Sequence, residues 1–125
     1  RLRCDWSSDV CSSDLLRRYM ARLVDEGITE RAYYLIGIGP LTSAKSARWM
    51  NDKLFGVHIP EPLIVRLEGA ADQRAEGRAI CAELLAELRA IDGVSGAHLM
   101  APGGEESIAR VIGDSGVLAA RSSAA

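Results

Sequence analysis

Aromatic residues, prolines and long apolar runs are all scarce in this chain of 125 residues. Aromatic residues make up 5%, prolines number four, and no apolar stretch approaches the roughly 18 residues that span a bilayer. An excess of one charge is also lacking, because 17 acidic residues offset 15 basic ones to give a net charge of -2. We therefore expect neither nucleic acid nor a membrane as a partner.

Cysteine is equally rare, and two of the three cysteines fall within the first 14 residues. Residues 5–15, DWSSDVCSSDL, lack the hydrophobic period of a helix or a strand and resemble the in-frame translation of a sequencing-library adapter. We expect residues 1–14 to be a non-native, disordered segment. Cys81 then remains as a small core residue, which implies no disulfide framework and a cytoplasmic protein.

The full sequence is 48% hydrophobic, and the part after residue 14 reads as helices separated by two short strands. Residues 32–38, AYYLIGI, are bounded by Gly39 and Pro40, which predicts a strand buried on both faces. The expected elements in order are a helix over residues 15–26, the strand at 32–38, a helix capped by Thr42 or Ser43 and ending at Gly56, a short helix ending at Gly69, a long helix capped by Asp72 and reaching Ile91, a strand over 94–100, a last helix after residue 104, and a frayed tail over 119–125. Gly77 should weaken the long helix by about 1 kcal/mol relative to alanine.

This order of elements is typical of parallel βα units with right-handed crossovers, so the expected fold class is α/β. Two parallel strands cannot close a barrel, and a complete (β/α)₈ barrel needs about 250 residues. The pair should leave apolar surface and unpaired strand edges open to solvent. We therefore expect a piece of a larger α/β fold.

Glycine-containing loops follow both predicted strands. Residues 37–42, GIGPLT, partly match a dinucleotide-binding fingerprint, but Pro40 removes a backbone donor and Thr42 replaces the last glycine. We therefore interpret this segment as a sharp turn from strand to helix. At residues 102–104, PGG, the glycines allow close approach of a ligand. Glu105 and Glu106 follow at the start of the next helix, and their negative charge disfavours a phosphate there. The loop is therefore expected to bind a neutral or cationic part of a ligand, or to be a plain loop.

Several further residues are weaker candidates for ligand contacts. Four of them begin the helix after the first strand, where ligands collect in βα folds, and are equally consistent with a solvated helix start. They are Lys45, Ser46, Arg48 and Trp49. His58 and His98 have no partner at metal-ligand spacing and are expected to be structural. Glu83 is expected to be a solubilising surface charge.

Four segments of the chain carry a resemblance to a known family: GIGPLTSAKSARWM, FGVHIP, RLEGAAD and GAHLMAPG. Residues 15 to about 118 resemble the C-terminal part of a methylenetetrahydrofolate reductase family protein. The resemblance implies strands seven and eight of a (β/α)₈ TIM barrel with noncovalent FAD. NAD(P)H would reduce the flavin, which would then reduce 5,10-methylenetetrahydrofolate to 5-methyltetrahydrofolate.

The same resemblance implies a folate site at four positions, Ser46, Met50, Pro102 and Gly104. Better-known members have glutamine and phenylalanine at the first two and leucine and arginine at the last two. It carries over no catalytic, FAD-binding or metal-binding residue, so the chain as written should be inactive and bind no FAD. Two alternatives are a non-catalytic α/β module that pairs its open strand edges with a partner, and a folate-dependent methyltransferase component.

Overall fold

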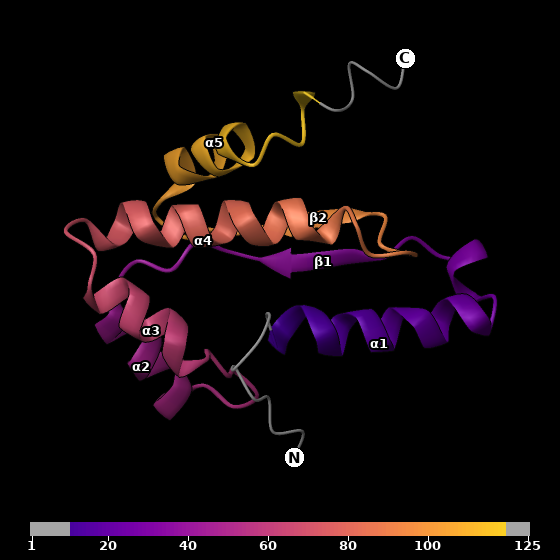
Figure 1. Ribbon diagram of the computed structural model, residues 1–125, viewed down its shortest axis with the longest axis horizontal. Coiled ribbons are helices and arrows are strands. Elements are labelled where there is room, and N and C mark those ends of the chain that lie inside the picture. Colours follow the sequence, from indigo (N-terminus) through magenta and orange to yellow (C-terminus); the bar gives the residue numbers. More distant parts are fainter. Residues whose placement is uncertain (1–10, 120–125) are drawn as a thin grey trace.

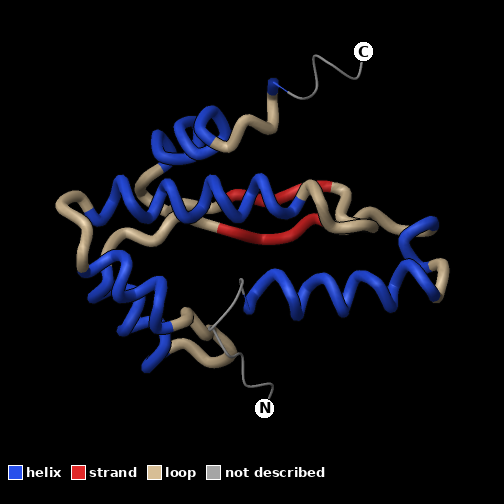
Figure 2. Tube along the Cα trace, viewed as in Figure 1, coloured by secondary structure: helices blue, strands red, loops and turns tan. Residues whose placement is uncertain are grey.

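Two parallel strands and five α-helices form the part of the chain that this computed structural model describes, residues 11–119 (Figures 1 and 2). In order they are α1 (Cys11–Asp25), the 3₁₀ turn η1 (Ile28–Glu30), β1 (Leu35–Ile38), α2 (Ala44–Lys53), α3 (Glu61–Glu68), α4 (Gln73–Leu88), β2 (Gly96–Leu99) and α5 (Glu105–Asp114). The expected α/β class and the order of elements are confirmed.

The sheet is a parallel pair in which Leu35 lies opposite Gly96 and Ile38 opposite Leu99. Side chains alternate between the two faces of a strand, and here one face is covered while the other is open. On the open face, Leu35 is 64% exposed. The expectation that the first strand is buried on both faces is therefore wrong, because its helices cover a single face.

Three helices, α1, α4 and α5, cover that one face of the sheet. Met20 of α1 and Leu88 of α4 form a core cluster against Ile36. Val111 of α5 packs with Leu85 of α4 in a second cluster, which also contacts β1 and β2. In Figure 1, α4 runs across the sheet with α1 on one side and α5 on the other.

A third core cluster lies away from the sheet, among α2, α3 and α4. Ala47 of α2 and the α3 residues Ile64 and Leu67 are almost fully buried there. Ile80 joins them from α4, as the predicted apolar stripe of that helix requires. Figure 2 shows α2 and α3 side by side, beyond the end of the strands.

Both helix caps predicted from the sequence are confirmed, and the first helix starts earlier than expected. Ser43 caps α2, and Asp72 caps α4 by accepting hydrogen bonds from two backbone N–H groups. Helix α1, however, begins at Cys11 rather than at Leu15, with Asp14 in its first turn. A carboxylate in the first turn of a helix is stabilised by the positive end of the helix dipole. Residues 1–10 of the expected non-native segment and 120–125 of the expected tail lie outside the described residues.

Gly77 is a packing requirement of α4 rather than a simple weak point. It is buried, and a Cβ atom at this position would collide with the backbone carbonyl of Leu41 in the loop before α2. The absence of a side chain lets that loop lie directly against the helix.

Candidate functional site

The loops that follow β1 and β2 lie at the same edge of the sheet, because the strands are parallel. Their backbones come together there, since a Cβ atom at Gly39 would collide with the carbonyl oxygen of Met100. Ligands of α/β folds bind at the carboxyl ends of the strands. This edge is therefore the candidate site, and Figure 1 shows both loops leaving the sheet at the same end.

The first loop leads into α2, whose N-terminus is bonded by the chain's own side chains. The Ser46 N–H donates to the Ser43 hydroxyl at 3.1 Å, and the Ala44 N–H donates to Gln73 Oε1 at 2.9 Å. Free N–H groups are what make a helix N-terminus attract anions. Their use within the protein disfavours an anionic group at the start of α2.

Ser46 and Met50 lie one turn apart on α2, and both are half-buried. Their i, i+4 spacing puts them on the same side of the helix. Lys45 and Trp49 lie on α2 too, but they are exposed, Trp49 to 55%. A serine hydroxyl can donate or accept a hydrogen bond, and a methionine offers a flexible apolar contact.

The second loop begins after β2 and turns into α5. Pro102 is exposed, Gly103 has the left-handed φ of 70° that favours glycine, and Gly104 is half-buried. The Gly104 N–H donates to the Ala101 carbonyl at 2.9 Å, which closes the turn. The four predicted folate positions therefore lie in two groups, one on α2 and one on this loop.

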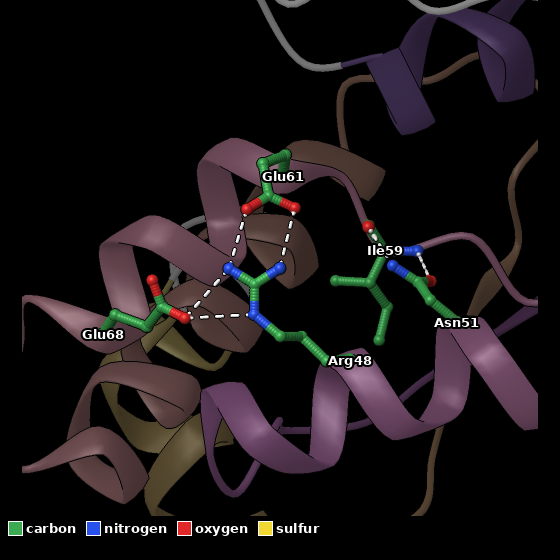
Figure 3. A network of polar contacts seen from close by, with 5 residues as sticks. All are labelled: Arg48, Asn51, Ile59, Glu61 and Glu68. Atoms are coloured by element: carbon green, nitrogen blue, oxygen red, sulfur yellow. Dashed lines mark hydrogen bonds and ion pairs between the residues drawn. The ribbon is translucent and has the colours of Figure 1, made fainter.

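Arg48 is held within the protein by two carboxylates of α3 (Figure 3). Its Nη1 and Nη2 donate to the two oxygens of Glu61 at 3.2 and 2.8 Å, and its Nε and Nη2 donate to Glu68 at 3.1 and 2.9 Å. Hydrogen bonding to Glu61, followed by Glu68, raises the pKa of Arg48. This engagement counts against Arg48 as a substrate contact.

Asn51 makes a second link between α2 and the segment before α3. Its Oδ1 accepts from the Ile59 N–H at 2.6 Å, and its Nδ2 donates to the Ile59 carbonyl at 2.7 Å, as Figure 3 shows. We call this pair of bonds the Asn51 clamp. Hydrophobic periodicity gives no sign of this clamp, because the pattern does not mark a side chain that bonds to the backbone eight residues away.

Arg66 ties α3 to α4 in the same way. It forms two hydrogen bonds with Glu83, at 2.7 and 2.8 Å, and another with Glu76. The hydrogen bond with Arg66 lowers the pKa of Glu83. The expectation that Glu83 is only a solubilising charge is therefore wrong, and the α2, α3 and α4 helices form one linked unit.

The described residues do not fit the diphosphate of FAD. A glycine in a dinucleotide-binding turn leaves space for a phosphate. Beside Gly39, the space that a Cβ atom would take is occupied by the carbonyl oxygen of Met100. The N-terminus of α2 is bonded internally, and that of α5 carries the exposed carboxylates of Glu105 and Glu106. Negative charge at that end repels a phosphate.

Metal and nucleophile chemistry find no support among residues 11–119. No group of three or more histidine, cysteine or acidic side chains is placed there to hold a metal ion. His58, in the loop between α2 and α3, and His98, on β2, are both exposed. Cys81 is buried in α4, and burial raises the pKa of its thiol to about 11, which disfavours the reactive thiolate.

The helices of the described residues include none with the length and apolar character needed to cross a membrane. Comparison of the chain with known protein families, with curated proteins and with solved structures finds no match.

Proposed function

We propose that residues 15–118 form the folate side of a cytoplasmic, flavin-dependent reductase of the methylenetetrahydrofolate reductase family. In this proposal the chain supplies about strands seven and eight of a (β/α)₈ barrel. The reaction would reduce 5,10-methylenetetrahydrofolate to 5-methyltetrahydrofolate with NAD(P)H. The observation that supports it best is the parallel pair β1–β2, covered by helices on one face and carrying both strand-end loops at one edge.

Within this proposal the chain binds substrate and does not handle the flavin. Ser46 would offer one hydrogen bond to a polar ring edge, and Met50 would pack against the ring. Pro102 and Gly104 would line the opposite side through the loop after β2. The carboxylates of Glu105 and Glu106 favour a neutral or cationic edge of the ligand at that loop.

The folate site can be tested on the chain as it exists. We expect saturation-transfer NMR with millimolar 5-methyltetrahydrofolate to show transfer to the ligand's ring protons. Met50→Ala should weaken that transfer at least twofold, since it removes the packing side chain. The matched control is Val65→Ala on α3, where the native side chain is 55% exposed and lies off the proposed site. Absence of transfer to the unmodified chain would contradict the proposal.

A further inference from the structure

The start of α2 has a backbone donor that the helix cannot satisfy by itself. The first backbone hydrogen bond of α2 runs from the Ala47 N–H to the Ser43 carbonyl at 3.0 Å, and the Ser43 hydroxyl accepts from the Ser46 N–H. The Ala44 N–H precedes this ladder, as the first N–H groups of every helix do. Ala44 is 4% exposed, so its N–H is largely shielded from water. Because a buried donor without an acceptor is costly, this N–H needs an acceptor from elsewhere in the fold.

Gln73 supplies that acceptor from the first turn of α4. Its Oε1 accepts from the Ala44 N–H at 2.9 Å, in a partly buried hydrogen bond between residues 29 apart. Gln73 is the first residue of α4. The turn that it begins is fixed by Asp72, whose carboxylate accepts from two backbone N–H groups at 3.0 Å each. The acceptor is therefore carried by a capped helix rather than by a loop.

A second contact, one turn along α4, holds the same connection between β1 and α2. Gly77 lies four residues after Gln73, so the two share one side of the helix. The carbonyl of Leu41 occupies the space beside Gly77. Leu41 and Ala44 are three residues apart, so α4 holds the connection at two points. Two points fix the direction in which α2 starts as well as its position.

We infer that Gln73 is a positioning residue of the proposed folate site, which sets the place of Ser46 through the Ala44 N–H. This inference rests on the proposed function. Ser46 follows Ala44 by two residues in the first turn of α2 and is half-buried, so a shift in the start of the helix moves its hydroxyl. A hydrogen bond weakens steeply when its distance or angle departs from the optimum. Gln73 therefore affects the ligand without touching it.

Two substitutions separate positioning from general stability. Gln73→Met keeps a long side chain and removes the acceptor, whereas Gln73→Glu keeps an acceptor oxygen. Saturation-transfer NMR measures binding of 5-methyltetrahydrofolate to the full chain, in about 0.5 M salt to screen the added charge. We expect Gln73→Met to weaken binding at least threefold and Gln73→Glu to stay within twofold of the unmodified chain. The matched control is Ser115→Ala, which removes two hydrogen bonds at the end of α5 and should leave binding unchanged.

Hydrogen exchange of the unmodified chain gives a second measurement that needs no variant. If the hydrogen bond between Gln73 and Ala44 favours binding of the ligand, thermodynamic linkage requires that the ligand favours this hydrogen bond. The Ala44 amide should therefore exchange at least twofold more slowly in millimolar 5-methyltetrahydrofolate, while the Ser115 amide exchanges at an unchanged rate. This measurement decides alone if Gln73→Met does not fold.

Three results would overturn the inference while leaving the proposed function in place, because the unmodified chain would still bind the ligand. They are equal binding by Gln73→Met and Ser115→Ala, binding by Gln73→Glu as weak as that by Gln73→Met, and an unchanged exchange rate at Ala44. Absence of binding to the unmodified chain would instead contradict the proposed function, and the inference with it.

Discussion

At the scale of single residues, the absence of a side chain at Gly77 allows α4 to pack directly against the loop before α2. Replacing an exposed helical glycine with alanine ordinarily adds about 1 kcal/mol to the free energy of unfolding. Here the new Cβ would collide with the Leu41 carbonyl, which belongs to the backbone and cannot rotate aside. We expect Gly77→Ala to lower the free energy of unfolding by about 1–3 kcal/mol, measured by chemical denaturation.

Gly113 provides the matched control for that substitution. It lies in α5, and a Cβ atom there would meet nothing within 4 Å. Gly113→Ala should therefore raise the free energy of unfolding by up to about 1 kcal/mol. If the two variants shift stability in the same direction, the close approach at Leu41 does not govern Gly77.

Cys81 provides a pH-dependent test of burial. Its pKa is raised from 9.0 to about 11, so the folded state favours the neutral thiol. This preference for the neutral thiol contributes to the stability of the folded state below pH 9, and the contribution is lost as the pH rises through 11. We expect the stability difference between Cys81→Ala and the unmodified protein to shrink over this interval, measured by denaturation at successive pH values.

Thiol labelling checks the same effect in a background where Cys4 and Cys11 are replaced by serine. At pH 8 the raised pKa alone should slow labelling of Cys81 about 100-fold relative to the unfolded chain. Equal labelling rates in the folded and unfolded states would contradict burial of this thiol.

At the scale of elements, the Asn51 clamp sets how α2 meets the segment before α3. Asn51→Ala removes two hydrogen bonds to Ile59 and should cost about 1–2 kcal/mol of unfolding free energy. Asn51→Asp keeps the acceptor and loses the donor, so it should fall between. Thermal unfolding measures both, with the exposed neighbour Asp52→Ala as control. A loss no larger than that of the control would contradict the clamp.

Sequence patterns predicted the local elements better than the contacts between them. Ser43 and Asp72 were identifiable as caps because a cap depends on residues within one turn. The partners of Arg48 could not be predicted, since they depend on how α2 and α3 are oriented. A weak signal did exist: Glu61 and Glu68 are seven residues apart, which places them on one stripe of a helix.

The shared edge of the two strand-end loops was predictable, and the contacts between the loops were not. Parallel βα order implied that the loops after β1 and β2 would leave the sheet at the same edge. The close contact of Gly39 with Met100 was not predictable, because it depends on the path of both loops. That contact is what removes the space for a phosphate.

At the scale of the whole molecule, the chain should not bind FAD by itself. Neither strand-end loop fits a diphosphate, and one face of the sheet is open to water. We expect titration of the full chain with FAD to leave flavin fluorescence unchanged at micromolar concentrations. Stoichiometric binding in that range would contradict this prediction, and free flavin with serum albumin serves as the control.

Helix α4 contributes to all three core clusters, through Ile80, Leu85 and Leu88. Every other helix of the described chain rests on it directly or through one neighbour. A single proteolytic cut within α4 would therefore disturb the support of all three clusters and leave the two fragments joined chiefly by the β1–β2 pairing, whereas a cut in the loop after Lys53 would leave α4 continuous beneath the clusters.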